Sequence, residues 1–407
     1  MSCLLPRLFV SSSKLQGVLS KHKLKTIVSC DHFLLQQFQC GSNVHYRGYM
    51  GFSLGDTNVS KAVSDAEKIV GYPTSFLSLR CLLSDELSNI ALHMRKLVGT
   101  KHPLLKTARG MVFDGKNNLQ LRGLLIMLIS KAAGPNPSAL HTEHEMISGV
   151  YPSQRSLAEI TEVIYTANLI HKGVVNLNEL LPDDGPFADM EFGNKMAVLS
   201  GDYLLASACS GLAKLGFPIV VEKVASCIAD MMSAEFTEYT DSNGKPNMPK
   251  SCLGFSDWLI QTHLSLGSLL AKSCQSAMIL AGHSKSFEDS AYAFGENTIY
   301  AQQMSKDIVS ITQKDELSNF SLTSAPVFLY KEIAPAQDFT HLETLWHGGA
   351  ANYKMITTIL LKSGVVDQCI ERCQQYRAQA IAALDCFQHS DAKSALINVV
   401  NAVSSLR

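Results

Sequence analysis

The chain has little charge, and neither sign dominates. Only 17% of its 407 residues are charged, and the formal net charge is −1. A domain that binds nucleic acid usually carries a basic excess or a basic stripe, so the composition predicts no nucleic-acid partner. Apolar residues make up 46% of the chain. That share is enough for a sizeable core and excludes wholesale disorder, while the length alone allows two domains.

Long hydrophobic runs are also missing. The longest uninterrupted apolar run, Leu124 to Ile129, has six residues, whereas a helix that spans a membrane needs about 20. The sequence therefore predicts no transmembrane segment. Peripheral contact with a membrane stays open, because a soluble protein can still handle a lipidic substrate.

The eleven cysteines show no disulfide framework, because they are scattered along a long chain. We expect free, buried thiols in a reducing compartment. Cys369 and Cys373 stand one helical turn apart, but no second Cys/His pair has a matching spacing, so core packing is favoured over a metal site. His141 and His144 do not follow the H-E-x-x-H pattern and lie among loop residues, which favours a solvated linker there.

Acidic residues are missing from the N-terminal segment. Residues 1–30 are rich in serine and contain five basic residues, and the first carboxylate is that of Asp31. This composition is typical of a mitochondrial transit peptide, whereas a secretory signal would need a longer apolar core. We predict a transit peptide and disordered leader over residues 1–45 and a location in the mitochondrial matrix. A merely disordered basic tail is the alternative.

Helical periodicity without any convincing strand run predicts an all-α protein. Ile160, Val163 and Ala167 recur at spacings of three and four and share one apolar face. Ser156, followed by Glu159, is a capping-box signature for the start of this helix. Further helices are predicted in residues 62–98 (two segments), 105–113, 119–133, 192–215, 220–236, 258–281, 293–311 and 365–406 (two helices, broken near 387–390).

The helix that begins near Ser156 carries a recognisable motif. Its segment EVIYTANLIHKGVVN, residues 162–176, resembles the first signature of the all-trans polyprenyl diphosphate synthases, usually E-x-x-H-T-A-S-L-x-H-D-D-x-x-D. The matching residues are Glu162, Thr166, Ala167, Leu169 and His171. The three aspartate positions are held instead by Lys172, Gly173 and Asn176.

These substitutions remove the expected metal ligands. In the family the aspartates hold magnesium ions that bind an allylic diphosphate, and magnesium prefers hard oxygen ligands, commonly carboxylates. Lysine, glycine and asparagine supply no anionic oxygen. Lys172 also brings a positive charge to the place where a dication would lie. The sequence therefore indicates a family member that keeps the fold without the metal chemistry.

The second aspartate signature, usually G-x-x-L-G-x-A-F-Q-x-x-D-D-x-x-D, is degenerate in the same way. Gly295, Ala301 and Gln303 fit it, but the metal positions read Lys306, Asp307 and Ser310. One carboxylate of three remains, and we expect Asp307 to be a solvated or salt-bridged helix residue. The block FGNKMAVLSGDYLL, residues 192–205, matches a third conserved pattern of the family closely. Its mid-helix glycine, Gly201, predicts a tight contact with another helix, because glycine there costs about 1 kcal/mol relative to alanine.

Cations that would hold diphosphate are missing too. The family motif G-G-K-R-x-R-P corresponds to residues 117–123, where only Arg122 remains, and a helix-surface role is favoured for it because a phosphate site needs several converging donors. Gln261 replaces the lysine of a K-T pair, and no arginine occurs between Arg155 and Arg372. Asp183 and Asp184 lie in LPDDGP, which is typical of a turn.

The resemblance implies an all-α, isoprenoid-synthase-type helical bundle around a central cavity, as a single domain over residues 60–407. Among family members the similarity is greatest to the subunit without aspartate motifs. It implies a non-catalytic or regulatory subunit of a mitochondrial heteromer, expected to be a heterotetramer, that makes the decaprenyl or solanesyl side chain of ubiquinone. The partner, an aspartate-bearing subunit, would bind Mg²⁺ and the isoprenoid diphosphates. This chain would bind no cofactor and would be inactive alone.

Two other functions stay open. The chain could be an autonomous prenyltransferase that uses Asp183, Asp184 or Asp307 as replacement ligands. It could also be a helical interaction module with no link to prenyl synthesis.

Overall fold

Helices form nearly all of the regular structure in the computed structural model, which describes residues 57–71, 97, 99–105, 107, 121–136, 146–236, 254–312, 321–347 and 352–406. The chain divides into two units, residues 1–46 and 47–407, and every described residue belongs to the second unit. In these ranges the only β-type pairing is an isolated bridge between Ile147 and Val150. The all-α prediction is confirmed.

Some of the predictions concern other residues. The predicted transit peptide (1–45), the helix predicted within residues 72–96 and the cluster of His141 and His144 lie outside the described residues. The single domain over residues 60–407 stays a prediction.

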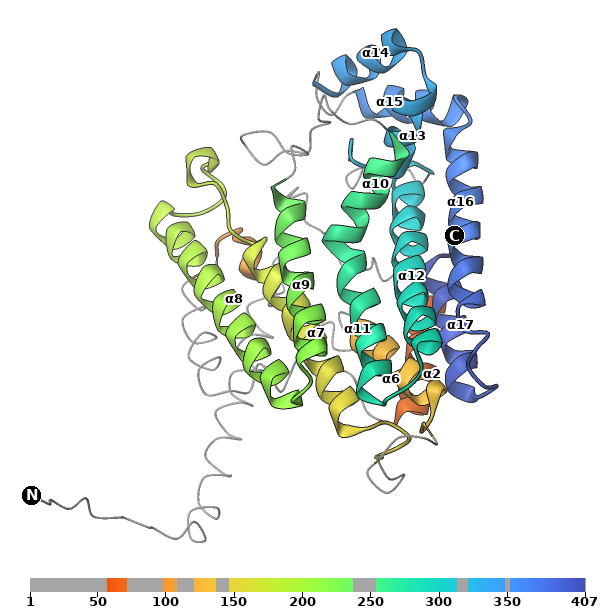
Figure 1. Ribbon diagram of the computed structural model, residues 1–407. Coiled ribbons are helices and arrows are strands. Elements are labelled where there is room, and N and C mark those ends of the chain that lie inside the picture. The colour runs from red at the N-terminus through yellow and green to blue at the C-terminus, as the bar shows by residue number, and fades with distance from the viewer. Residues whose placement is uncertain are drawn as a thin grey trace, which may run out of the picture. The chain divides into compact units, whose positions relative to one another are not determined.

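The helices are labelled in Figure 1 where there is room. In chain order they are α2 (Thr57–Val70), α6 (Leu121–Ala133), α7 (Pro152–His171), the 3-10 turn η4 (Leu177–Glu179), α8 (Phe187–Leu215), α9 (Pro218–Glu235), α10 (Phe255–Thr262), the π-helical segment η5 (His263–Gly267), α11 (Ser268–Leu280), α12 (Lys285–Thr312), α13 (Ala325–Ile333), α14 (Ala336–His347), α15 (Tyr353–Lys362), α16 (Val365–Ala382) and α17 (Asp391–Val403).

The start of α7 differs from the prediction. The helix begins at Pro152, four residues before Ser156. Proline suits the first turn of a helix because its missing N–H would have no helical partner there. The Gln154 side chain accepts a hydrogen bond from the backbone N–H of Tyr151 at 3.1 Å, and thereby satisfies one donor at the end of the helix. The spacing of Ser156 and Glu159 therefore lies inside the helix.

Several other bounds also differ. α8 begins at Phe187, directly after Pro186, and α12 begins at Lys285. The helix predicted over residues 258–281 is interrupted by η5, and α14 and α15 were not predicted. The break predicted between the last two helices is confirmed, because α16 ends at Ala382 and α17 begins at Asp391.

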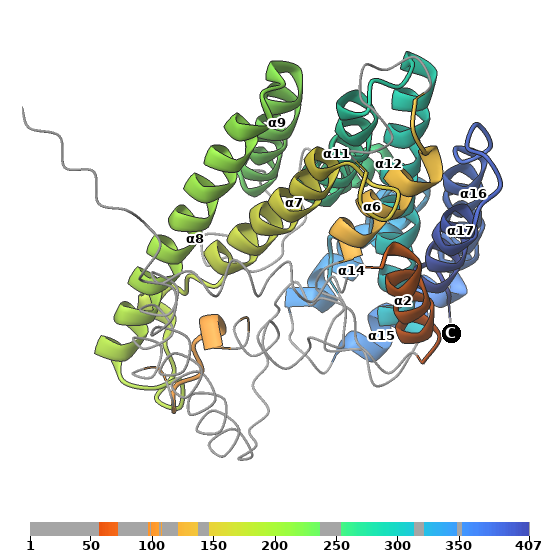
Figure 2. The same ribbon diagram turned by 90° about the horizontal axis from the view of Figure 1, so that it is seen from below.

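The helices enclose two hydrophobic cores. The larger core takes buried side chains from α2, α6, α7, α8, α9, α11, α12 and α17. The second core joins the C-terminal part of α12 to α10 and α13–α16. α11 lies between α9 and α12, while α7 packs against α6 and α8, as Figures 1 and 2 show. The first degenerate signature runs over the C-terminal end of α7, and the metal positions of the second lie near the C-terminal end of α12.

The two cysteines one turn apart belong to the second core. Cys369 and Cys373 are buried on α16. The Cys373 thiol donates a hydrogen bond to the carbonyl of Ala301 at 3.3 Å, which joins α16 to α12. Burial raises the pKa of Cys369 to about 12 and that of Cys373 to about 11. These thiols stay protonated at neutral pH and pack as small apolar side chains.

α8 differs from the other described helices in its length and apolar composition. It alone among them is long and apolar enough to cross a membrane by length and composition. Its apolar character does not show as an uninterrupted run in the sequence, because small polar residues such as Ser200 and Ser207 divide its apolar stretches. Only 33% of its most apolar stretch is buried. Much of this helix therefore lies outside the core of the chain.

Candidate functional site

The first signature ends in an ion pair in place of a metal site. Lys172 is the C-cap residue of α7, and its Nζ lies 2.6 Å from a carboxylate oxygen of Glu235 at the end of α9. Gly173 is buried, and a Cβ added to it would lie 3.5 Å from the backbone nitrogen of Leu104. Asn176 is exposed and caps η4 by accepting the N–H of Asn178 at 3.1 Å.

The second signature keeps one carboxylate, but this carboxylate binds the protein itself. Asp307 accepts hydrogen bonds from the Trp258 indole N–H at 3.0 Å, from the Gln303 amide at 2.9 Å and from the backbone N–H of Ala325 at 2.8 Å. Ala325 is the first residue of α13, so Asp307 stabilises the start of that helix. Ser310 donates to the backbone carbonyl of Asp307 at 2.7 Å.

Asp307 is buried, so the expectation of a solvated residue is wrong. Burial raises the pKa of its carboxyl group to about 6, although the hydrogen bonds from Ala325, Gln303 and Trp258 and the charge of Lys306 act in the opposite direction. Lys306 itself is half-buried. Its pKa is lowered to about 8 by burial and by the positive charge of Arg122, against the smaller attraction of Asp307.

Arg122 is more enclosed than a helix-surface arginine. Its guanidinium carbon lies 3.5 Å from the centre of the Tyr165 ring on α7, a cation–π geometry. Its Nε is buried and has no hydrogen-bond partner among the described residues. The neighbouring Glu162 is also buried and accepts the backbone N–H of Gly123 at 2.6 Å.

Asp183 and Asp184 belong to the turn between η4 and α8, as predicted. Asp183 is exposed. Asp184 is buried, and its carboxylate accepts the backbone N–H of Leu181 at 2.8 Å while its carbonyl accepts that of Lys101 at the same distance. The Asp184 carboxylate thus stabilises the loop.

These residues do not fit a magnesium site. No group of three or more His, Cys, Asp or Glu side chains in the described ranges lies close enough to hold a metal ion. At the signature positions the remaining side chains are either cations or already committed to internal contacts. Magnesium requires several hard oxygen ligands in octahedral geometry, and the signature positions of this chain do not supply them.

The FGNK…SGD block, residues 192–202, packs against two histidines of the chain, His102 and His171. Gly193 leaves room for the imidazole of His102, whose Nε2 lies 3.1 Å from the Asn194 side-chain oxygen. The Asn194 side chain also makes two 2.8 Å hydrogen bonds, from its oxygen to the backbone N–H of Val175 and from its amide to the Val175 carbonyl. The start of the block therefore anchors the C-terminal end of the first signature, just beyond α7.

Gly201, the second glycine of the block, leaves room for a histidine side chain of α7. A side chain on Gly201 would overlap the imidazole of His171. The His171 Nε2 lies 3.3 Å from a carboxylate oxygen of Asp202 and 3.3 Å from the carbonyl of Val198. The mid-helix glycine therefore allows α7 and α8 to pack closely, as its position in the sequence predicts.

Gly201→Ala is expected to lower the free energy of unfolding by roughly 2 kcal/mol, because the new methyl group displaces His171 from Asp202. In a His171→Ala background the same change should be neutral or stabilising, since alanine favours a helix over glycine by about 1 kcal/mol. Urea unfolding of the four proteins measures this coupling. Equal effects of Gly201→Ala in both backgrounds would contradict the contact.

Glu162→Gln is expected to flatten the dependence of stability on pH. Burial raises the pKa of Glu162 from 4.5 to about 7, although Arg122 and the backbone N–H of Gly123 lower it. Between these two values the folded chain binds more protons than the unfolded chain, so stability falls as pH rises from about 4.5 to about 7. The contribution of this one group is roughly 3 kcal/mol.

Chemical unfolding at pH 5 and pH 7.5 checks this expectation. Glutamine can still accept the Gly123 N–H but does not titrate. The variant should therefore lose less stability than the parent between pH 5 and pH 7.5. Asp307 gives both proteins a smaller slope of the same sign. Identical slopes in parent and variant would show that Glu162 does not titrate in this range.

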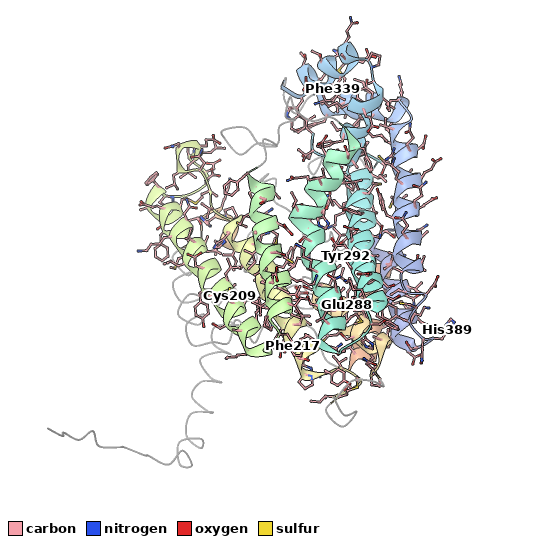
Figure 3. All side chains as sticks on the ribbon, viewed as in Figure 1. Cys209, Phe217, Glu288, Tyr292, Phe339 and His389 are labelled. Carbon is pink, nitrogen blue, oxygen red and sulfur yellow. The ribbon has the colours of Figure 1, made fainter. Side chains whose placement is uncertain are left out.

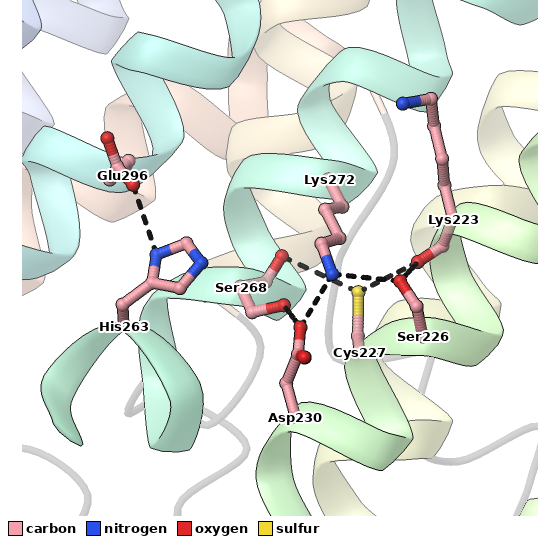
Figure 4. Close-up of polar contacts among 8 residues, drawn as sticks. All are labelled: Lys223, Ser226, Cys227, Asp230, His263, Ser268, Lys272 and Glu296. Carbon is pink, nitrogen blue, oxygen red and sulfur yellow. Dashed lines mark hydrogen bonds and ion pairs between the residues drawn. The ribbon is translucent and has the colours of Figure 1, made fainter. Parts of the chain in front are cut away.

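A second polar cluster, shown in Figure 4, was not predicted. The Lys272 ammonium on α11 lies 2.6 Å from the Asp230 carboxylate and donates to the Ser226 hydroxyl at 2.8 Å, both on α9. The Ser268 hydroxyl also donates to Asp230. Burial acts to raise the pKa of Asp230, but the hydrogen bonds from Lys272 and Ser268 keep it below the ordinary value.

The same region holds His263, whose Nδ1 lies 3.0 Å from a carboxylate oxygen of Glu296 on α12. The contacts drawn in Figure 4 join α9 to α11 and η5 to α12, except those of Ser226 and Cys227 to the Lys223 carbonyl, which lie within α9. We interpret the cluster as structural, because its ion pairs join α9 to α11 and η5 to α12. Sequence spacing alone does not reveal such pairs, since Asp230 and Lys272 are 42 residues apart.

Two degenerate signatures, on the helices α7 and α12 of an all-α bundle, define the class of protein. The sequence model of the family described as "Polyprenyl synthetase" matches residues 103–319, more than half of the chain. The chain belongs to this family.

Relatives support the same conclusion. The protein named "All trans-polyprenyl-diphosphate synthase PDSS2" is 47% identical over 350 residues in Mus musculus, with 85% of this chain and 87% of that protein covered. A "Probable hexaprenyl pyrophosphate synthase, mitochondrial" from Neurospora crassa is 30% identical over 391 residues, with 86% and 84% covered.

Solved structures show the same fold at lower identity. A polyprenyl synthase from Caulobacter crescentus, crystallised with calcium and isoprenyl diphosphate, is 19% identical and superimposes with a TM-score of 0.60 over 86% of this chain and 98% of that one. A geranylgeranyl pyrophosphate synthase from Lactobacillus brevis gives a TM-score of 0.61 at 18% identity, over 86% and 99%. The predicted isoprenoid-synthase-type bundle is confirmed.

Proposed function

We propose that this chain is the non-catalytic subunit of a heteromeric all-trans polyprenyl diphosphate synthase that makes the side chain of ubiquinone. The observation that carries the proposal is that residues at the signature positions make contacts within the chain. Lys172 pairs with Glu235, and Asp307 stabilises the start of α13. Both positions have acquired internal structural contacts in a chain that retains the fold of the family.

Prenyl transfer requires neutralisation of the departing diphosphate, which metal ions and aimed cations supply in enzymes. This chain lacks the carboxylates for the metals and most of the cations for the phosphates. An aspartate-bearing partner subunit is therefore proposed to bind Mg²⁺ and to ionise the allylic diphosphate. The similarity to relatives named as polyprenyl synthases supports a role in the synthesis of polyprenyl diphosphate.

The outer face of α8 is the proposed contact with that partner. Between Met196 and Ala213 the helix carries one charged residue, Asp202, which pairs with His171. The exposed residues of this stretch recur mostly at helical spacing and are otherwise apolar or small. They are Val198, Leu199, Ala206, Ser207, Cys209 (labelled in Figure 3), Ser210 and Ala213. An exposed apolar stripe of this length is typical of a surface that another helix covers.

A location in the mitochondrial matrix is proposed as well. It is supported by the acid-poor N-terminal segment and by relatives whose names include the word mitochondrial, such as the Neurospora crassa protein. The names of the relatives support the mitochondrion, and the composition of residues 1–30 supports the matrix.

Co-expression tests the proposal. The chain should co-purify with an aspartate-bearing homologue, and the complex should make polyprenyl diphosphate where the homologue alone makes little. Leu199→Asp on α8 should separate the two proteins. Leu361→Asp on α15 is the matched control, because both leucines are 48% exposed. A complex that survives Leu199→Asp would refute the α8 interface, and recovery of no prenyl synthase would refute the function.

A further inference from the structure

One face of α15 exposes apolar and basic side chains together. The helix buries Ile356 and Leu360 in the second core. Its exposed residues are Lys354, Met355, Thr358, Leu361 and Lys362. At about 100° per residue, these five positions share roughly a third of the circumference of the helix. Met355 is 52% exposed and Leu361 48%, so both apolar side chains lie largely outside the core.

The two lysines of this face have no partner in the described part of the chain. Neither ammonium group forms an ion pair or a hydrogen bond with a described residue, and α15 contains no acidic residue. Lys354 and Lys362 stand near the two ends of the helix, about 12 Å apart along its axis. Lysines beside exposed apolar side chains are typical of a helix that lies on a membrane surface, because the apolar groups enter the interface while the ammonium groups meet anionic head groups.

An aromatic pair lies beside the start of α15. The rings of Trp346, near the end of α14, and of Tyr353, the first residue of α15, meet edge to face with their centroids 5.6 Å apart. Both residues are half-buried, and tryptophan and tyrosine are enriched where a membrane meets water. α13, α14 and α15 lie together at one end of the bundle, as Figure 1 shows. An element at the end of the bundle is accessible to a flat bilayer.

Charge distinguishes this face from the outer face of α8. The exposed stripe of α8 between Met196 and Ala213 carries one charged residue, Asp202, whose carboxylate pairs with His171. That stripe suits an apolar surface of another protein. The face of α15 has a lysine at each end and no carboxylate, and it therefore suits a negatively charged surface.

We propose that the exposed face of α15 is a contact surface for a membrane that contains anionic lipids. Met355 and Leu361 enter the interface, while Lys354 and Lys362 meet the phosphate groups of the lipids. The inference rests on the proposed function in one respect: a polyprenyl diphosphate is largely hydrocarbon, so its release next to a bilayer avoids exposing that chain to water. The surface consists of this chain's own residues and is separate from the proposed partner contact on α8.

Co-sedimentation of the full-length chain with lipid vesicles tests this surface. The chain should bind vesicles made of equal parts of phosphatidylcholine and phosphatidylglycerol, and added salt should weaken the binding because it screens the lysines. The double variant Lys354→Gln/Lys362→Gln should bind roughly tenfold more weakly, since each lysine near an anionic membrane contributes several-fold. The control Lys61→Gln/Lys214→Gln removes the same charge from exposed positions on α2 and α8 and should bind like the parent. All these proteins keep the basic residues 1–30, so a difference between the two double variants comes from α15.

A second pair of variants tests the apolar contact. Met355→Asp should weaken binding to the same vesicles roughly fivefold, because it removes apolar area and adds a negative charge. Ile219→Asp on α9 is the matched control, since both side chains are 52% exposed, and it should leave the binding unchanged. Urea unfolding should be the same for both variants and the parent, because neither side chain is part of a core.

Several results would overturn the membrane surface. They are no binding by the parent, equal binding to vesicles of phosphatidylcholine alone, and equal binding by the α15 variants and their controls. Loss of the partner subunit from Met355→Asp would assign the face to a protein and would overturn it as well. The proposed function is tested separately, because Leu199→Asp should release the partner and still bind vesicles, whereas a chain that binds no vesicles but retains its partner leaves that function intact.

Discussion

Gly295→Ala is expected to destabilise the chain by about 3 kcal/mol, because the added methyl group would meet the backbone of a neighbouring helix. Gly295 lies on α12, and a Cβ there would lie 2.8 Å from the Cα of Ala271, 2.9 Å from its N and 3.0 Å from the carbonyl carbon of Leu270. All three atoms are backbone. No side-chain rotation can relieve this overlap, so α11 and α12 would have to separate.

Gly211→Ala on α8 is the matched control. The new Cβ would meet only the end of the Ile160 side chain, at 3.0 Å and 3.1 Å. A small adjustment of that side chain should suffice, and alanine gains about 1 kcal/mol of helix propensity over glycine. Thermal and urea unfolding should therefore show a clear loss for Gly295→Ala and little change for Gly211→Ala. Comparable stability of the two variants would contradict the close packing of α11 on α12.

Asp307→Ala is expected to lower stability by roughly 3 kcal/mol. The substitution leaves the Trp258 indole N–H and the Ala325 backbone N–H buried without an acceptor, and each such orphan costs about 1–3 kcal/mol. Asp307→Asn should be much milder. Its amide oxygen can still accept a hydrogen bond, and it removes a carboxylate whose pKa burial raises to about 6.

The pair of variants also separates a structural role from a metal-binding one. If Asp307 only stabilises the fold, the complex that contains Asp307→Asn should retain its prenyltransferase activity with an unchanged requirement for magnesium. If Asp307 were a replacement ligand, the same variant should lose activity or need far more magnesium. Activity and stability are therefore to be measured on the same preparation.

The sequence was sufficient for the helical class and for most of the helices that hold the signatures. Apolar spacing located α7, and the glycine at residue 201 indicated a close helix contact, because both depend on local periodicity. The degenerate metal positions were also legible, since the chemistry of Lys172 or Lys306 does not depend on the fold.

Contacts between distant residues could not be read in this way. The sequence predicted a solvated or salt-bridged Asp307. The hydrogen bonds that Asp307 accepts from Trp258, 49 residues earlier, and from Ala325, beyond the end of α12, leave no periodic signal. Likewise, the start of α7 was misplaced because two capping patterns, at Tyr151 and at Ser156, occur within one and a half turns. In the structure the helix starts directly after Tyr151, with Pro152 in its first turn and the Gln154 side chain accepting the Tyr151 N–H.

The most direct measurement is an assay of the purified full-length chain alone, with magnesium, a prenyl diphosphate and isopentenyl diphosphate. We predict no product above the level without protein, at any magnesium concentration, from a chain that still assembles with its partner. Product that disappears with EDTA and with Asp307→Asn or Asp184→Asn would show that the chain binds its own metal, and would contradict a non-catalytic role.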